Sequence, residues 1–329
     1  MPTLLESLAP EPVADFCAIT RYEGDAQWPQ TGDFIQPHIH AVEHGSLPIV
    51  WRDGAHKGRL WGSLSLFDVA GDLHRVVVSR HEIDTYDFAK LRLGPGRVGH
   101  RILRPLSEDS TVLELIAWFQ TGTRRVFVVD RDCRPIGHID LSAFIRALVD
   151  RYPALIEGRT VERVMLHNPS SLGTVLAQPA WQALLKFSRW RRMVFVYVLG
   201  SFTKMLTPTM LIDRLSANGG IRKLTIAEAF PDSDSYRRPG GRGTGGASRH
   251  ASVAPPWPSV PLDALVADVL GQLLERQELL VHDPEDTQLE PPSEGEAESF
   301  QPKYACAGHL SMSYLFVDDV LPRLDQLQG

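Results

Sequence analysis

One order of secondary structure recurs four times along this chain of 329 residues, and the recurrence restricts the folds that the chain can adopt. The unit is clearest between residues 109 and 149. Asp109–Thr111 can cap a helix at its start, and Thr121-Gly122 can end it. Apolar periodicity predicts a helix over 112–119, strands over 126–129 and 136–139, and a second helix over 141–149.

The same order of helix, strand, strand and helix is predicted in three other parts of the chain. The first repeat has a helix over 34–44, strands over 47–51 and 60–64, and a helix from Ser65 onward. The third has a helix over 181–187, strands over 193–199 and 202–206, and a helix opened by Thr207-Pro208. The fourth has a helix over 262–275, strands over 279–282 and 307–310, and a final helix. The sequence therefore predicts an α+β fold built from four repeats.

Two stretches carry a family resemblance. Residues 126–130 with 135–139, a strand ending in Val-Asp, a turn and a Gly-aliphatic strand, resemble the CBS domain. Gly62–Asp68 resembles that family's Gly-x-x-Ser/Thr-x-x-Asp ending. The resemblance is to four-repeat proteins such as the gamma subunit of AMP-activated protein kinase and the plant PV42-like proteins, and both subfamilies stay open.

The resemblance implies that the repeats pair into two Bateman modules. The first module is expected over 1–155, with repeats at about 14–75 and 97–152. The second is expected over 156–329, with repeats at about 160–216 and 220–328.

Two polar stretches interrupt the second half of the chain. Residues 231–261 are rich in Pro, Gly, Ser and Arg, which predicts a flexible linker because few side chains there can be buried. Residues 283–299 carry acidic but no basic side chains, which predicts a solvated acidic loop. Within the linker, Ser252 follows Arg249 by three residues, a pattern that basophilic kinases accept, and its phosphorylation stays an open question.

Composition limits the class of partner and the compartment. Apolar residues make up 43% and charged residues 22%, as in soluble globular proteins, and a net charge of −6 does not favour nucleic acid or anionic membranes. The three cysteines, Cys17, Cys133 and Cys306, lack zinc-site spacing, which predicts buried thiols in a reducing compartment. The sequence has no visible secretory signal or membrane-length apolar run. We therefore expect a cytoplasmic protein, with the nucleus as an alternative.

A cleft that binds an adenosine phosphate needs an apolar slot, a carboxylate for the ribose and cations for the phosphates. By resemblance to the CBS family, Asp68 would accept both ribose hydroxyls and Ser65 would face the phosphate or sugar. The alternative is a capping box, in which Ser65 caps the helix and Asp68 reaches back to it. The two roles are compatible.

The other repeats depart from this pattern. In the second repeat, Asp140 takes the hydroxyl position and Ala143 replaces the Asp. The third and fourth repeats keep the hydroxyl in Thr207 and Ser311, but Met210 and Tyr314 replace the Asp. At most one complete site is expected, with weaker contributions from Thr207 and Ser311.

Two pairs of arginines precede predicted strands: Arg124 and Arg125 in the second repeat, and Arg191 and Arg192 in the third. By resemblance, basic residues at this junction face the cleft between repeats and hold phosphates. The alternative is that the arginines are solvated and pack their stems over the sheet edge.

The sequence contains no constellation for bond-making chemistry. His38, His40 and His44 lack a complete ligand set, so we expect no metal; a metal-dependent enzyme that uses these histidines is kept as a third alternative, which metal analysis of the protein would test. We therefore predict a non-catalytic regulatory subunit without a required cofactor, whose regulatory ligand is AMP, ADP or ATP. Its partner, by resemblance, is a kinase catalytic subunit with its scaffold subunit. The alternative function is a structural CBS scaffold whose ligand sites are degenerate.

Overall fold

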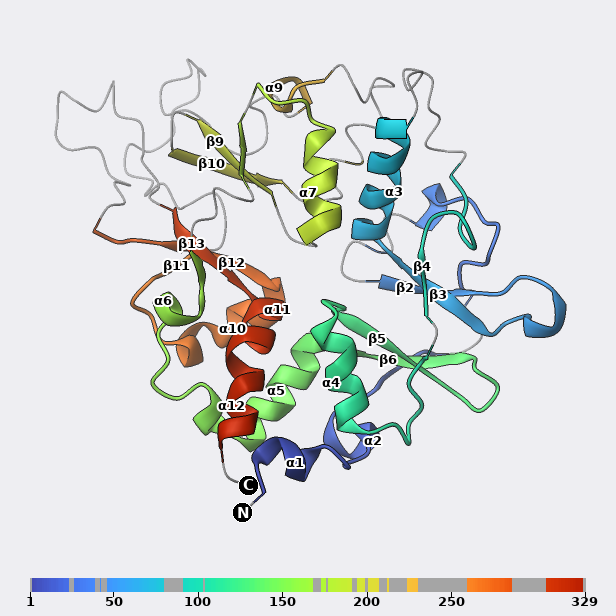
Figure 1. The fold of residues 1–329 in the computed structure, drawn as a ribbon, viewed down its shortest axis with the longest axis horizontal. Helices are drawn as coiled ribbons and strands as arrows, with labels where there is room; N and C mark the ends of the chain where they lie inside the picture. The colour runs from blue at the N-terminus through green and yellow to red at the C-terminus, as the bar shows by residue number, and fades with distance from the viewer. Residues whose placement is uncertain are drawn as a thin grey trace, which may run out of the picture.

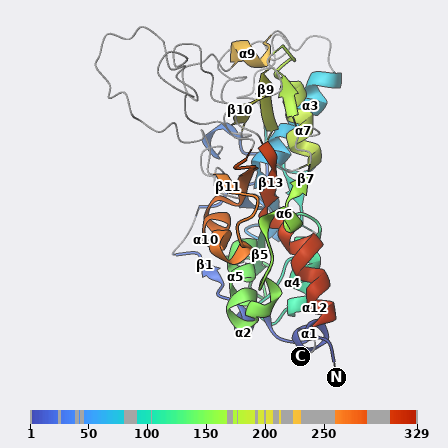
Figure 2. The same cartoon turned by 90° about the vertical axis from the view of Figure 1, so that its left-hand side faces the viewer.

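The computed structural model describes residues 2–23, 27–38, 42, 46–79, 91–102, 104–167, 173–175, 177–190, 194–198, 201–206, 212, 224–229, 259–285 and 306–327. In these residues, helices and strands form four units arranged around a centre in a flat slab, as the two perpendicular views show (Figures 1 and 2). The N-terminal and C-terminal helices lie side by side at one edge of the slab (Figure 1).

The second repeat matches its prediction closely. It consists of α4 (Val112–Gln120), β5 (Arg125–Val129), β6 (Pro135–Asp140) and α5 (Leu141–Arg151). Thr111 caps α4 through a capping box: its Oγ1 accepts the Glu114 N–H at 3.3 Å, and Glu114 Oε2 accepts the Thr111 N–H at 2.8 Å. Gly122, which follows the helix, has a φ of +82°.

The hairpins of the other repeats are also where they were predicted. The first repeat contains β2 (Ser46–Val50), β3 (Leu60–Ser65) and α3 (Leu66–Ser79). The third contains α7 (Gln182–Trp190), β9 (Val194–Val198) and β10 (Ser201–Leu206). The fourth contains α10 (Val266–Arg276), β12 (Glu278–His282), β13 (Cys306–Ser311), α11 (Met312–Tyr314), the π-helix η8 (Leu315–Val320) and α12 (Leu321–Gln326). The remaining short elements are α1 (Leu4–Leu8), α2 (Val13–Phe16), η3 (Gly54–His56), η6 (Pro153–Leu155), α6 (Val161–Val164) and α9 (Ile226–Ala229).

The predicted helix over 34–44 is wrong for the residues that the structure describes there. These form only a 3₁₀ turn, η1 (Gln36–His38). Pro37 has no N–H for a helix interior, and Phe34 and Ile35 are held in an extended segment instead: Phe34 bridges Arg92, and the Ile35 N–H donates to the Leu91 carbonyl at 3.0 Å.

Three two-residue strands connect neighbouring repeats, and none of them was predicted from the sequence. Near the start of the second repeat, β4 (His100–Arg101) pairs with β3 of the first. Conversely, β1 (Thr20–Arg21), near the start of the first repeat, pairs with β6 of the second. In the same way β7 (Leu166–His167), near the start of the third repeat, pairs with β13 of the fourth. The first and second repeats therefore exchange strands, and the third and fourth are tied by one.

A glycine lies at each of these crossings. A Cβ added to Gly137 would lie 2.7 Å from the Thr20 carbonyl oxygen, and one on Gly308 would lie 2.8 Å from the Leu166 oxygen. Gly62 faces the His100 carbonyl in the same way. The glycine of the Gly-x-x-Ser/Thr-x-x-Asp pattern is thus required by the close approach of a crossing strand.

Parallel pairing also recurs on the other side of each hairpin. In the third repeat β8 (Gly173–Val175) runs parallel to β9, and in the fourth β11 (Ser259–Pro261) runs parallel to β12. Single parallel bridges, Gln30 with Val50 and Leu106 with Val128, take this place in the first two repeats. The predicted linker over 231–261 is therefore wrong at its last three residues, which form β11.

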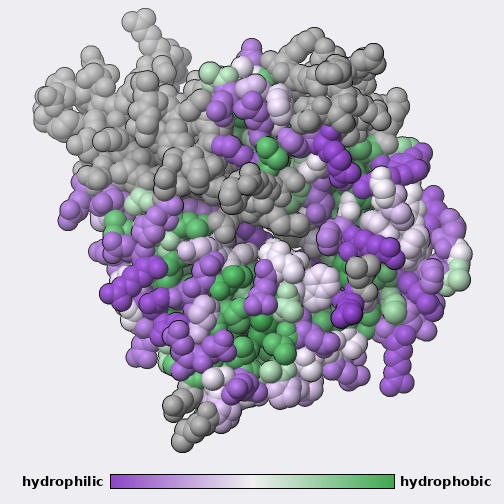
Figure 3. Space-filling view, in the orientation of Figure 1, coloured by the Kyte–Doolittle hydropathy of each residue, from purple (hydrophilic) through white to green (hydrophobic). Residues whose placement is uncertain are grey.

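Two hydrophobic cores join the repeats through their helices. One contains the second and fourth repeats together with the N-terminal helices, and the other contains the first and third repeats. Helix α3 packs against α7, and α5 packs against α10 and α11. Apolar side chains gather over α4 and α5 on the face drawn in Figure 3. A smaller cluster of Leu60, Phe127 and Val129 joins the sheets of the first two repeats. The module boundary near residue 155 stays a prediction.

The cysteines do not share one environment. Cys17 is buried as expected, and burial raises the pKa of its thiol to about 12. Cys133 is exposed in the turn between β5 and β6, where its φ is +61°, so the prediction of a buried thiol is wrong there. The tight hairpin turn places it in solvent. The side chain of Cys306 lies outside the described part of the chain.

Several other predictions fall on residues that the structure does not describe. These include Ser252, the linker up to residue 258 and the acidic loop from residue 286 to 299. Among the residues that are described, no helix has the length and apolar character needed to cross a membrane.

Candidate functional site

Ser65 and Asp68 meet where β3 ends and α3 begins. The Ser65 hydroxyl and N–H donate to Asp68 Oδ2 at 2.6 and 3.1 Å, and the Asp68 N–H donates to Ser65 Oγ at 3.2 Å. This is the capping box that the sequence left as an alternative. Ser65 is buried and Asp68 half-buried, so the box also fixes the direction of a carboxylate at the edge of the first repeat.

The hairpins place equivalent residues in equivalent positions. Ser46 at the start of β2 pairs with Ser65 at the end of β3. In the second repeat the corresponding pair is Arg125 with Asp140. Because side chains alternate along a strand, Ser63 projects from the same sheet face as Ser65, while Leu64 between them is fully buried in the second core.

Arg125 connects the second repeat to the first. Its guanidinium forms a bidentate pair with Asp140, with Nε–Oδ1 at 2.6 Å and Nη2–Oδ2 at 3.0 Å, and its Nη1 donates to the Ser46 carbonyl at 3.3 Å. Burial opposes ionisation of Asp140, but hydrogen bonds from His138 and Arg125 outweigh it and lower the pKa of Asp140 to about 2. Arg125 is therefore held at the junction, within reach of the strand that ends in Ser65.

Arg124 points toward the fourth repeat and is not a solvated surface arginine. It pairs with the Glu278 carboxylate, donates to Gln277 Oε1 at 3.1 Å, and its guanidinium carbon lies 5.7 Å from the centre of the Phe67 ring. Its side chain is only 14% exposed. The alternative of solvated arginines is therefore wrong for Arg124.

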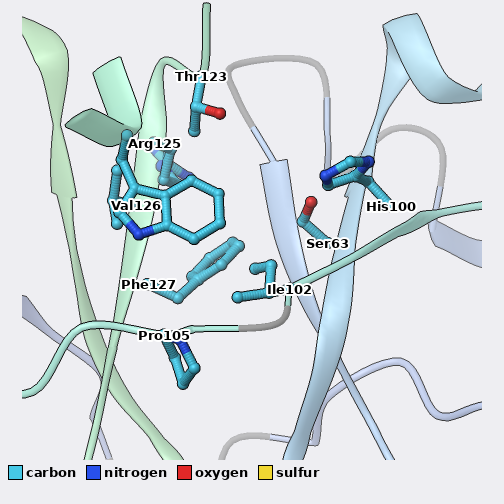
Figure 4. Close-up of a pocket in the computed structure, with 9 residues that line it drawn as sticks. Ser63, His100, Ile102, Pro105, Thr123, Arg125, Val126 and Phe127 are labelled. Atoms are coloured by element: carbon cyan, nitrogen blue, oxygen red, sulfur yellow. The ribbon is translucent and has the colours of Figure 1, made fainter. Parts of the chain in front are cut away.

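A small pocket, open to solvent, lies between the first two repeats. Thr123, Arg125, Val126 and Phe127 of the second repeat face Ser63 of the first and His100 of β4, with Ile102 and Pro105 below (Figure 4). Trp118 completes the apolar lining. Since a strand advances about 3.4 Å per residue, Ser63 lies about 7 Å along β3 from Ser65.

Arg125 links the pocket to the strand pair that ends at the capping box. It lines the pocket and donates to the Ser46 carbonyl, and Ser46 pairs with Ser65, whose hydroxyl donates to Asp68. Among the predicted site residues, the structure brings Ser65, Asp68, Arg124 and Arg125 to this junction.

The remaining predicted site residues are not part of it. Ser311 is fully buried at the end of β13, opposite Glu278 in the fourth repeat. Thr207, Arg191 and Arg192 lie outside the described residues. Of the predicted histidines, His40 and His44 also lie outside them, and no group of three or more potential metal ligands occurs in the described part.

Asp72, one turn after Asp68 on α3, is a titratable group that the sequence did not single out. Its side chain is 10% exposed, pairs with Arg75 and accepts the Gly99 N–H. Burial, and to a lesser extent the neighbouring Asp68 charge, raise its pKa to about 6 despite Arg75.

Because this pKa is higher in the folded protein, Asp72 stabilises the fold fully below about pH 4 and loses this contribution as pH rises through about 6. We expect Asp72→Asn to gain on the order of 2 kcal/mol of stability relative to wild type between pH 4 and pH 7.5. Urea unfolding at both pH values measures this change. If the free energy of unfolding differs between variant and wild type by the same amount at both pH values, the pKa of Asp72 is not raised in the folded protein.

Comparison with known proteins bears on the fold. No protein-family model and no curated protein match the chain. Among solved structures, the protein MJ1225 from Methanocaldococcus jannaschii, described as a proposed archaeal homologue of g-AMPK, matches with a TM-score of 0.63 and 13% identity. The match covers 93% of this chain and 98% of MJ1225.

Shorter matches are to CBS-domain structures. CBSX2 of Arabidopsis thaliana, solved in complex with AMP, is 20% identical and covers 43% of this chain and 97% of its own, with a TM-score of 0.29. A CBS domain from Sphaerobacter thermophilus is 15% identical and covers 44% and 92%, also with a TM-score of 0.29. The match to MJ1225 over nearly the whole chain, with the helix–strand–strand–helix units of the structure, confirms the predicted α+β CBS fold.

Proposed function

We propose that this chain is a non-catalytic regulatory protein that binds an adenine nucleotide between its first and second CBS repeats. The observation that carries the proposal is the convergence of a polar helix start, Ser65 and Asp68, with Arg125 from the neighbouring repeat beside an apolar pocket.

Each part of a nucleotide has a chemical counterpart in this region. The pocket between Val126, Phe127 and Ile102 offers apolar walls for a base, with Ser63 and Thr123 as polar groups. Asp68 offers a carboxylate for the ribose hydroxyls. Arg125, with the N-terminus of α3, offers positive charge for a phosphate.

A route from the site to a partner surface follows from the packing. Helix α3 begins at the site, runs for 14 residues and packs against α7 of the third repeat. A ligand that fixes the start of α3 would bias the contact between the first and third repeats. The resemblance to the gamma subunit makes a protein kinase complex, located in the cytoplasm, the partner of this proposal.

A structural scaffold is the second candidate, and one observation favours it. Both arginines of the second repeat already have internal carboxylate partners, Asp140 and Glu278. A scaffold with degenerate sites would keep these pairs for stability and bind no nucleotide.

Calorimetric titration of AMP into the wild type and Asp68→Asn decides between the two candidates. Asn keeps the size of the side chain but removes the charge that strengthens hydrogen bonds to the ribose, so we expect AMP binding to weaken about 10- to 100-fold. Glu114→Gln is the matched control, since it alters the equivalent capping box on α4. It should leave AMP binding unchanged.

If the wild type binds no AMP at millimolar concentration, the scaffold is correct. If both variants bind AMP like the wild type, a nucleotide is bound elsewhere and Asp68 has only its capping role.

A further inference from the structure

The fourth repeat reverses the charge found in the second. Glu278 begins β12 and pairs with Ser311, the same hairpin position that Arg125 holds opposite Asp140 in β5 and Ser46 holds opposite Ser65 in β2. Where the second repeat has Arg124-Arg125, the fourth has Gln277-Glu278.

These two dipeptides meet across the molecule. The Arg124 guanidinium donates to the Glu278 carboxylate and to Gln277 Oε1. His309 Nε2 lies 2.5 Å from the second Glu278 oxygen. The Glu278 side chain is 1% exposed and His309 is fully buried, so this anion is enclosed by protein.

Glu278 is ionised in this setting. Its burial opposes the charge, but Arg124 and His309 outweigh the burial and lower the pKa of its carboxyl below the ordinary value. The pair is thus a guanidinium and a carboxylate in a water-poor interior, where an ion pair is much stronger than at the surface.

Near the proposed nucleotide site, the arginines that could hold phosphates already have carboxylate partners. Among the described residues, Arg124 and Arg125 bring two positive charges, whereas Asp68, Asp140 and Glu278 bring three carboxylates. A chain of two or three phosphates would have to separate both arginines from their partners. One phosphate needs only the accessible side of Arg125.

We propose that Glu278 is an internal counter-ion that occupies Arg124 in place of a ligand phosphate, and thereby restricts the site to adenine ligands with at most one phosphate. The inference about ligand class rests on the proposed function. The occupation of Arg124 does not, and inorganic tripolyphosphate tests it separately.

Glu278→Gln removes the charge while keeping an oxygen that can accept from Arg124. In magnesium-free buffer we expect wild-type protein to bind AMP at least tenfold more tightly than ATP. The variant should bind ATP more tightly than the wild type does, so that the ratio of AMP affinity to ATP affinity falls about tenfold. A general loss of structure would weaken both ligands together, so the ratio separates the two effects.

Tripolyphosphate followed by thermal unfolding provides the second readout. It should raise the melting temperature of Glu278→Gln by several degrees and leave that of the wild type unchanged. In the double variant Arg124→Gln/Glu278→Gln, tripolyphosphate should no longer raise the melting temperature. Asp319→Asn is the matched control, because Asp319 is another buried carboxylate that pairs with an arginine, Arg159. Tripolyphosphate should not raise the melting temperature of this control variant.

The proposal is overturned if tripolyphosphate stabilises the wild type and Glu278→Gln equally, or stabilises neither. A failure of AMP to bind either protein removes the proposed function and the ligand-class inference with it, while the tripolyphosphate result still decides whether Glu278 occupies Arg124. Equal AMP-to-ATP ratios in both proteins, with AMP bound, remove only the role of Glu278 in selecting the ligand.

Discussion

Gly137→Ala is expected to lower the free energy of unfolding by about 2–3 kcal/mol, although alanine is the smallest possible addition. The added methyl would lie 2.7 Å from both the Thr20 carbonyl oxygen and Ile19 Cγ2. Carbon atoms do not approach this closely, so β1 has to move away from β6. That movement weakens the hydrogen bonds by which β1, near the start of the first repeat, joins the sheet of the second.

Chemical denaturation of the variant measures this effect, and Gly271→Ala supplies its control. Gly271 is an exposed residue within α10, and a Cβ there would meet nothing within 4 Å. Because alanine favours helix over glycine, this control should be neutral or gain up to about 1 kcal/mol. If both variants unfold alike, the crossing strands do not join the repeats tightly.

Arg124→Met is expected to have a still larger effect, a loss of about 3–5 kcal/mol. The substitution keeps a long apolar side chain but leaves the enclosed Glu278 carboxylate without its guanidinium. His309 would still contact the second Glu278 oxygen, but the buried carboxylate would lose the permanent positive charge that compensates for its missing water. The second and fourth repeats, which share one core, would be destabilised together.

Urea unfolding of Arg124→Met and Arg151→Met compares the loss of a buried ion pair with the loss of an exposed one. Arg151 pairs with Glu11 at 2.7 Å, but its side chain is 48% exposed, so its removal should cost less than about 1 kcal/mol. A loss at Arg124 no larger than the loss at Arg151 would show that the Arg124–Glu278 pair contributes little to the fold.

The hairpins and most of their flanking helices could be predicted because each is specified locally. Apolar runs such as 126–129 and helix starts such as Thr111 carry their signal within a few residues. The crossing strands β1, β4 and β7 could not be predicted, because two residues show no periodicity. The glycines that accommodate them are visible in the sequence, but the reason for them lies in a distant segment.

The same division holds for the candidate site. The spacing of Ser65 and Asp68 on one helical turn was enough to predict that they meet. The partners of the arginines could not be predicted in this way, because Asp140 is 15 residues from Arg125 and Glu278 is 154 residues from Arg124. A pattern of basic residues before a strand indicates available charge, but only the assembled repeats show which carboxylates already hold that charge.

Titration of AMP into the purified wild-type chain, followed by isothermal calorimetry, tests the central claim most directly. Only the first repeat keeps the Gly-x-x-Ser-x-x-Asp pattern, and Ser63, two residues before Ser65 on β3, lines the pocket between the first two repeats. We therefore expect saturable binding of one AMP per chain. The absence of binding at millimolar AMP, or the binding of four AMP molecules per chain, would contradict the account.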